Sequence, residues 1–268
     1  MASLIVVITV GGWIGRQPDG FARAWDAIMS GQVTDPSKQL ARPSNGPPPG
    51  LEEEQVRLLP PVSAATTPVA GAFTRTQEGP DGGTVPVAWS PCRPIHYVVN
   101  PAGAPVGFAD TVAVAMRELS GLTGLVFVDD GVTAEAAVEQ RGAYQPNLYG
   151  DRWAPVIVQF TDETADPGLA GRVAGMAGVQ AVADPTTGLQ HFTTGSVHLD
   201  VTLLAQPSNG AEAVYLSVLR HELGHLIGLA HVENPTQIMN ATAFVETYQE
   251  GDLAGLAVLG RGACAPGL

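Results

Sequence analysis

The sequence has 268 residues, 45% of them apolar, which is enough for one large domain or two small ones with a sizeable core. Its formal net charge is −13 at pH 7, and Lys38 is the one lysine. A chain without a basic patch cannot neutralise phosphates, so the composition argues against a nucleic-acid partner and indicates a soluble, self-repelling protein.

The N-terminal segment, residues 1–15, is strongly apolar but shorter than the roughly 20 residues of a membrane span. It suits the hydrophobic region of a signal peptide, although no Lys or Arg precedes it. A buried strand is the alternative, because "LIVVITV" is rich in β-branched residues. We favour export, with the segment either cleaved or kept as a membrane anchor, and therefore expect a secreted or extracellular protein.

Residues 16–69 differ in composition from the rest of the chain. Half of the 22 prolines precede residue 91, and the run "PSNGPPPG" is typical of an extended, semi-rigid segment. This segment is a linker or a removable pro-segment, and the sequence fits both. We expect the globular domain over residues 70–268, with a hairpin at 70–90 around "GPDGG" and a core at 91–268.

The hydrophobic pattern of the core predicts a definite order of elements. The expected elements in chain order are strand 95–100, helix 108–124, strand 125–130, a polar excursion at 131–152, strand 154–161, strands around 173–183 and 195–201, helix 211–229 and helix 249–260. The run at 154–161 is uninterruptedly apolar, as in a strand covered on both faces. The long helix therefore enters only after the sheet is complete.

That long helix carries an unusual concentration of histidines. His221, His225 and His231 are half of the histidines in the chain and fall within eleven residues. The first two are four residues apart, so they share one helix face and can reach one cation. Gly228 can end the helix in a left-handed conformation, which lets His231 supply a third nitrogen from outside it.

Three neutral imidazoles leave one tetrahedral position open for water, which is typical of catalytic rather than structural zinc. Glu222 is displaced around the helix from the ligands and can approach that water without binding the metal. The full spacing arises by chance in roughly one such chain in 10⁵, whereas a lone His-Glu-x-x-His would be a weak signal.

The stretch "HELGHLIGLAH" resembles the zinc-binding consensus of the metzincin metallopeptidases, and "NPTQIMN" resembles their Met-turn, with Met239 eight residues beyond His231. That interval, and the similarity of "YQEGDLAGLAVLG" to a matrixin C-terminal helix, point most closely to a bacterial matrixin-like family. The resemblance covers residues 93–260.

This resemblance implies an α+β fold of the zincin or metzincin type: a twisted mixed sheet, an active-site helix, a Met-turn and a C-terminal helix. It implies a secreted zinc endopeptidase with one catalytic Zn²⁺ on His221, His225 and His231. Glu222 would be the general base for a zinc-bound water, and Met239 an apolar floor below the metal. We expect a monomer acting on protein or peptide substrates, with the strand at 195–201 as the sheet edge that aligns them. The alternative is a non-hydrolytic zinc-binding module displayed outside the cell.

The sequence also departs from the family pattern. Asn240 and Ala241 stand where the family has Tyr-Pro, and Tyr248 is expected to pack or cap a helix rather than bind metal. A second, structural zinc site is not recognisable. His191 and His198 are either remnants of such a site or solvent-facing strand residues, and we favour the second interpretation. Acidic loops at 129–131 and around residue 162 are either calcium sites or simply solvated.

Cys92 and Cys264 are the only cysteines. In matrixins a propeptide cysteine often caps the zinc, but "SPCRP" does not match that motif. Cys92 precedes the first core strand and Cys264 follows the last helix, so the two can meet at one edge. We expect a disulfide, which would stabilise the fold by about 4 to 5 kcal/mol; two unrelated buried thiols are the alternative.

Overall fold

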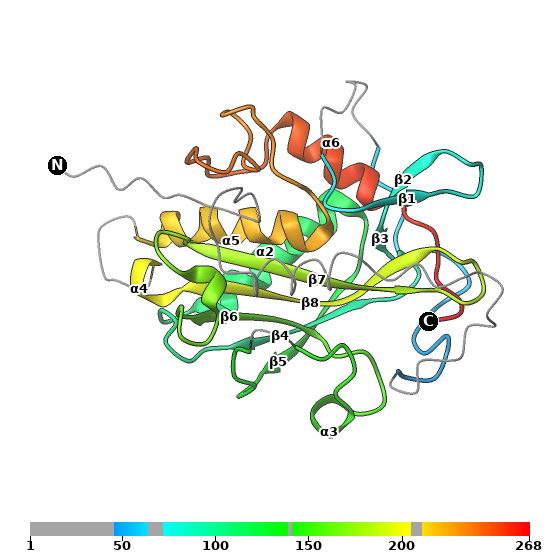
Figure 1. The fold of residues 1–268 in the computed structure, drawn as a ribbon, viewed down its shortest axis with the longest axis horizontal. Coiled ribbons are helices and arrows are strands. Elements are labelled where there is room, and N and C mark those ends of the chain that lie inside the picture. Colours follow the sequence, from blue (N-terminus) through cyan, green and yellow to red (C-terminus); the bar gives the residue numbers. More distant parts are fainter. Residues whose placement is uncertain (1–45, 64–71, 139–140, 205–210) are drawn as a thin grey trace, which may run out of the picture.

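The computed structural model describes residues 46–63, 72–138, 141–204 and 211–268 (Figure 1). The apolar segment 1–15, residues 16–45 and 64–69 of the Pro-rich segment, and the first two residues of the predicted hairpin, 70–71, lie outside these ranges. Among the described residues, no helix combines the length and apolarity needed to cross a membrane.

The fold is α+β, as predicted, and its centre is one six-stranded twisted sheet. The strands of that sheet are β3 (Ala88–Trp89), β4 (Ile95–Asn100), β5 (Phe127–Val132), β6 (Val156–Thr161), β7 (Gly175–Ala183) and β8 (Gln190–Asp200). Their order is β3-β8-β6-β4-β5, with β7 added alongside β8. All pairs are parallel except β7 with β8, so the sheet is mixed.

The edge of this sheet differs from the prediction. β8, which contains most of the expected edge strand 195–201, pairs with β6 and β3 along one side and with β7 along the other. It is therefore an interior strand. β7 pairs with β8 alone among the described strands, so the free antiparallel edge belongs to β7. The prediction was wrong because the order of strands depends on long-range pairing rather than on the local apolar pattern.

The helices are α2 (Phe108–Thr123), α3 (Pro146–Tyr149), α4 (Val201–Leu204), α5 (Ala211–Ile227) and α6 (Glu250–Leu259). The long helices α2, α5 and α6 cover one face of the sheet (Figure 1). The main core lies between the two layers. On α2, Val112, Met116 and Leu119 are buried, as the helical period predicts, and Leu122 is half-buried against the core.

A separate hairpin precedes the core, as expected from "GPDGG". Its strands β1 (Thr76–Glu78) and β2 (Thr84–Pro86) pair antiparallel. Gly82 at its tip has φ 75°, a left-handed conformation that disfavours residues with a side chain. The hairpin is fixed to the main sheet through Gln77, whose side chain hydrogen bonds the backbone of Gln190 at both its amide and its carbonyl.

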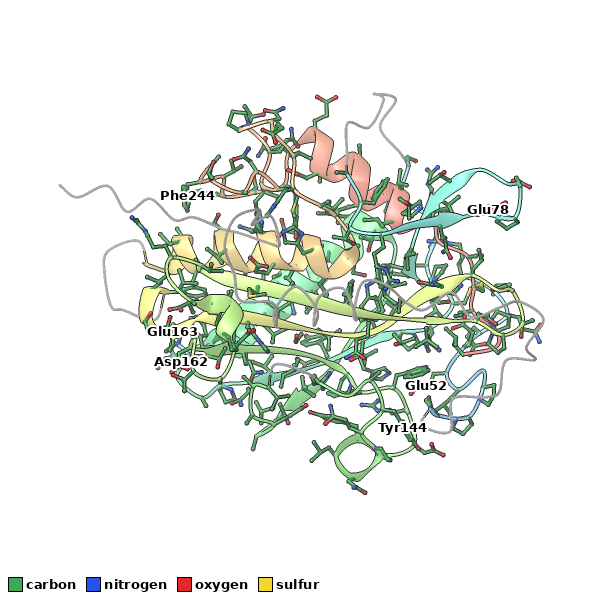
Figure 2. All side chains as sticks on the ribbon, in the orientation of Figure 1. Glu52, Glu78, Tyr144, Asp162, Glu163 and Phe244 are labelled. Atoms are coloured by element: carbon green, nitrogen blue, oxygen red, sulfur yellow. A yellow bond between two sulfur atoms is a disulfide. The ribbon has the colours of Figure 1, made fainter. Side chains whose placement is uncertain are left out.

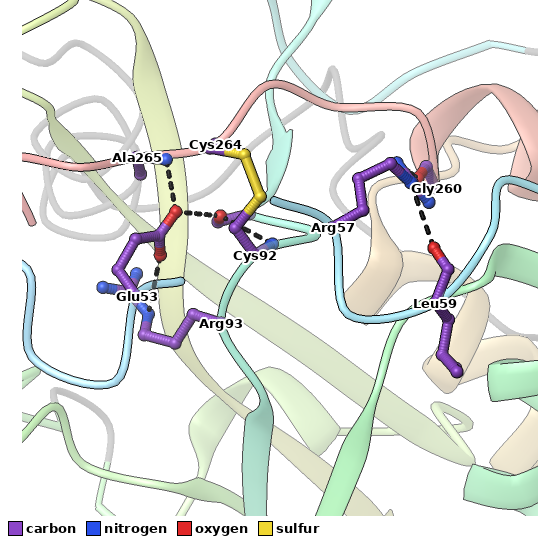
Figure 3. Close-up of a disulfide and its surroundings, with 9 residues drawn as sticks. Glu53, Arg57, Leu59, Cys92, Arg93, Gly260, Cys264 and Ala265 are labelled. Carbon is purple, nitrogen blue, oxygen red and sulfur yellow. Dashed lines mark hydrogen bonds and ion pairs between the residues drawn. A yellow bond between two sulfur atoms is a disulfide. The ribbon is translucent and has the colours of Figure 1, made fainter. Parts of the chain in front are cut away.

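Residues 46–63 contain no helix or strand, yet they pack against the domain instead of extending away from it. The buried Glu53 is the centre of this contact. One of its carboxylate oxygens accepts hydrogen bonds from the Ser90 hydroxyl and the Ala265 amide, both at 2.5 Å (Figure 3). The amide of Glu54 donates to the Cys92 carbonyl at 2.8 Å. Packed structure thus begins before residue 70.

Cys92 and Cys264 form a disulfide beside this contact, with Cα atoms 5.3 Å apart (Figure 3). It joins the segment before β4 to the segment after α6, as the positions of the two cysteines predicted. The bond crosses 172 residues of sequence, so it removes much conformational entropy from the unfolded chain.

Reduction of this disulfide should lower the free energy of unfolding by up to about 5 kcal/mol on chain-entropy grounds. The measurement is the urea midpoint of the chain with and without reductant. A Cys92→Ser, Cys264→Ser double variant should match the reduced protein and ignore the reductant. Equal midpoints for the oxidised and reduced chains would contradict a stabilising role.

Candidate metal centre

The helix α5 is buried on nearly all sides in its C-terminal half. It contacts β7 and β8 on one side and α2 and α6 on others. From Ser217 to Ile227 every residue except Arg220 is buried. A polar side chain in this part of the helix is therefore removed from bulk water and needs a partner within the protein or a ligand.

The three predicted histidines meet at one point. The Nε2 atoms of His221 and His231 are 3.0 Å apart, and Nε2 of His225 is 3.1 Å from each of the other two. These rings come from two positions on α5 and one in the loop that follows. Among the described residues they form a group of ligand atoms able to hold a metal ion.

The backbone fixes which nitrogen of each helical imidazole carries the proton. Nδ1 of His221 donates to the Ile238 carbonyl at 2.6 Å, and Nδ1 of His225 donates to the Leu229 carbonyl at 2.7 Å. A neutral ring protonated at Nδ1 presents a lone pair at Nε2. The Nε2 atoms of the two helical histidines are therefore acceptors that face each other, an arrangement that favours a cation between them.

Zinc fits this donor set. Tetrahedral coordination at about 2.0–2.1 Å separates ligand nitrogens by about 3.3 Å, close to the spacing here. Hydrogen bonds from Nδ1 to backbone carbonyls are also the usual way in which ligand histidines are oriented. A set of three imidazoles leaves one position for water or substrate.

Burial keeps the histidines neutral and ready to bind metal. It lowers the pKa of His221 to about 3, with a further contribution from the nearby His231. The pKa of His225 lies well below its ordinary value because of burial and the two neighbouring imidazoles. Burial also lowers the pKa of His231. At neutral pH none of the three needs to lose a proton before it binds a cation.

Gly228 ends the helix as predicted, with φ 122°. Its amide donates hydrogen bonds to the carbonyls of Gly224 and His225, and the Leu229 amide also donates to the Gly224 carbonyl. A Cβ at position 228 would lie 3.0 Å from Leu259 and 3.2 Å from Phe192. Both the backbone conformation and the close packing therefore require glycine here.

Met239 is buried directly against the helix. A Cβ on Gly224 would lie 2.5 Å from the Met239 sulfur, so the glycine makes room for this side chain. The Asp252 carboxylate, in the first turn of α6, accepts hydrogen bonds from the amides of Ile238 (2.9 Å) and Met239 (3.3 Å). The turn is thus held between α5 and α6, and the same turn supplies the carbonyl that orients His221.

Asn240 connects this turn to the segment after His231, a role that the sequence did not reveal. Its amide donates to the carbonyls of Val232 (3.0 Å) and Glu233 (3.1 Å). Its carbonyl oxygen accepts from the amides of Thr242 and Ala243. The side chain therefore shapes the loop in which this chain departs from the matrixin Tyr-Pro pattern.

Glu222 is fully buried, and neither carboxylate oxygen has a hydrogen-bond partner among the described residues. Burial raises its pKa to about 8. A Cβ on Gly175 would lie 2.8 Å from Glu222 Cγ, so the first residue of β7 passes directly over this side chain. Such an unpartnered carboxylate is costly in an inert core and is typical of a site that acts on a bound molecule.

The two histidines of β8 were predicted to face solvent, and this prediction was wrong. His191 and His198 are only 2% and 4% exposed, because β8 is an interior strand. Nδ1 of His198 donates to the Asp166 carboxylate at 2.6 Å, and Nε2 accepts from the Gln159 amide at 3.1 Å. His198 is therefore satisfied by the protein itself.

Two further expectations concern Tyr248 and the acidic loops. Tyr248 is buried and its hydroxyl donates to the Arg220 carbonyl at 2.6 Å, which confirms a packing role.

Asp162 accepts hydrogen bonds from amides of its own loop, which lies with Glu163 at the end of the sheet next to α4 (Figure 2). Calcium binding at the acidic loops stays a hypothesis.

The three histidines lie within a region that matches a known protein family. The family model of the matrixins (Peptidase_M10) matches residues 154–255, from the start of β6 into α6. No curated protein matches the sequence. This region of the chain is matrixin-like, and it is shorter than the span 93–260 that the sequence motifs suggested.

One solved structure similar to this chain is a zinc-dependent peptidase from Methanocorpusculum labreanum (strain Z). The two sequences are 19% identical, and the alignment covers 54% of this chain and 86% of that one with a TM-score of 0.30. At this score the likeness carries no structural argument, and the assignment rests on the matrixin match and the metal centre.

Zinc binding at pH 7 should release about one proton from Glu222. Without metal the carboxyl keeps its proton below pH 8, and a dication beside it favours the carboxylate, so its pKa falls on binding. The histidines add nothing because they are already neutral. Calorimetry in buffers of different ionisation enthalpy measures this proton, and Glu222→Gln should not release it. Equal proton release by the two proteins would show that Glu222 does not sense the metal.

Proposed function

We propose that this protein is an extracellular zinc endopeptidase in which His221, His225 and His231 hold the ion and Glu222 is the general base. The observation that carries the proposal is the convergence of three Nε2 atoms that could hold a cation, next to an unpartnered buried carboxylate on the helix that supplies two of them. When bound, the ion supplies Lewis-acid chemistry, lowering the pKa of a water molecule and polarising a peptide carbonyl.

Glu222 accepts the proton of the attacking water and delivers it to the leaving amine. Burial favours the protonated form of Glu222 and raises its pKa to about 8, whereas a bound dication favours the carboxylate, so the two effects change its proton affinity in opposite directions. Neither carboxylate oxygen has a hydrogen-bond partner among the described residues, and the pKa shift is caused by burial. Met239 packs against α5 and is not a ligand in this scheme.

The substrate is an extended peptide that pairs with the free edge of β7. This strand begins at Gly175, next to Glu222, and continues for nine residues to Ala183. Main-chain hydrogen bonds to a strand edge hold a peptide in register without requiring particular side chains. A site placed against the edge of the strand favours cleavage within a chain rather than at its end.

Export is supported by the disulfide and by the apolar residues 1–15. A disulfide persists in oxidising compartments and is rare in the cytosol, and this one joins two distant parts of the fold. The proposal includes either a cleaved signal or an N-terminal anchor. A non-hydrolytic zinc-binding module is the second candidate, but metal binding alone gives no reason for the unpartnered Glu222 in the core.

The two candidates differ in the behaviour of Glu222→Gln. If Glu222 is the base, the variant keeps about one zinc per chain and loses about 10²–10⁴-fold in the rate of peptide cleavage. The measurement pairs zinc content with cleavage of casein or a quenched peptide. Glu78→Gln makes the same chemical change on the exposed hairpin and should leave both quantities unaltered (Figure 2).

Cleavage that is undiminished in Glu222→Gln would remove Glu222 from the mechanism. One zinc per chain with no cleavage by the unmodified protein over a broad peptide set would instead favour the binding module.

A further inference from the structure

His231 is the one residue of the centre that no helix supports. Residues 228–233 form no helix and no strand, so the position of its ring depends on how the surrounding backbone is held. Among the described residues none accepts a hydrogen bond from Nδ1 of His231, whereas both helical histidines have such a partner. The loop itself must therefore be fixed from outside.

One side of the loop is fixed by the Met-turn. The Val232 amide donates to the Met239 carbonyl at 3.0 Å, and Asn240 binds the two carbonyls that follow His231. These contacts fall within the region that matches the matrixins. They hold the chain after His231 but not the chain before it.

The other side is fixed by a segment from a different part of the sequence, residues 72–74. The Ala230 amide donates to the Ala72 carbonyl at 2.8 Å, and the Thr74 amide donates to the Gly228 carbonyl at 2.9 Å. Phe73 and Leu229 form an antiparallel bridge, and the Phe73 side chain packs against the core. Residues 72–74 thus pair with the three residues that connect the end of α5 to His231.

We propose that residues 72–74 are a positioning element of the metal centre, although they lie upstream of the matrixin-like region. The pairing fixes residues 228–230, and this in turn fixes the direction from which His231 meets the other two imidazoles. The inference rests on the proposed metal-binding role of His231. Because coupling between two equilibria is reciprocal, a metal that needs His231 in place must also strengthen the pairing with residues 72–74.

The first test uses the unmodified full chain and zinc alone. Native-state hydrogen exchange should slow at the amides of Ala230 and Thr74 when zinc is added, although neither residue is a ligand. The Gly82 amide, which donates to Gly79 within the hairpin, is the internal control and should exchange at the same rate. Slower exchange at Ala230 with no change at Thr74 would overturn the coupling.

The second test is a variant that loosens the segment without touching a ligand. Phe73→Ala removes its core anchor and should speed zinc loss to excess chelator by about tenfold, the lower range for residues that orient ligands. Phe73→Leu keeps an apolar anchor and should largely restore retention. Leu122→Ala is the matched control, because Leu122 is a half-buried residue of α2 that packs against the same core.

Equal rates of zinc loss in Phe73→Ala and the unmodified chain would overturn this inference while leaving the peptidase proposal intact. So would a Leu122→Ala variant that loses zinc as fast as Phe73→Ala, because the effect would then reflect general destabilisation. Failure of the unmodified chain to bind zinc would contradict the proposed function itself.

Discussion

The structure is organised around three imidazole nitrogens that approach within 3.1 Å of one another. The two that belong to the long helix present their lone pairs to each other, which is unfavourable without a positive charge between them, so the fold must hold them in place. The long helix supplies two of the rings at the spacing of one turn. A glycine turn brings in the third, and a buried turn from the C-terminal part of the chain supplies the carbonyl that orients the first. Most contacts near the centre serve this convergence.

The same region carries a stability cost that a purely structural core would avoid. Glu222 is buried with no hydrogen-bond partner among the described residues, and the space for it exists only because Gly175 lacks a side chain. Gly224 makes similar room for Met239. Burial raises the proton affinity of this carboxyl group, which is the property that the proposed general base uses when it takes a proton from water.

Local features of this fold were predictable from the sequence, and features set by long-range pairing were not. The period of Val112, Met116 and Leu119 predicted α2, and Gly228 predicted the end of α5. The edge strand was predicted wrongly, because the apolar pattern of a strand's sequence is the same whether neighbouring strands pair with one or with both of its sides. His191 and His198 were misplaced for the same reason. The proline content of residues 46–63 predicted an extended chain. It could not show that the buried carboxylate of Glu53 would hold this segment against the domain through hydrogen bonds.

We conclude that the three Nε2 atoms are the ligands of one zinc ion. The most direct test is the zinc content of the full-length protein after dialysis against metal-free buffer, compared with His231→Ala. We expect about one zinc per chain in the unmodified protein and a large loss of retention in the variant, which has only the two helical ligands. Full occupancy in His231→Ala, or no retained zinc in the unmodified protein, would contradict it.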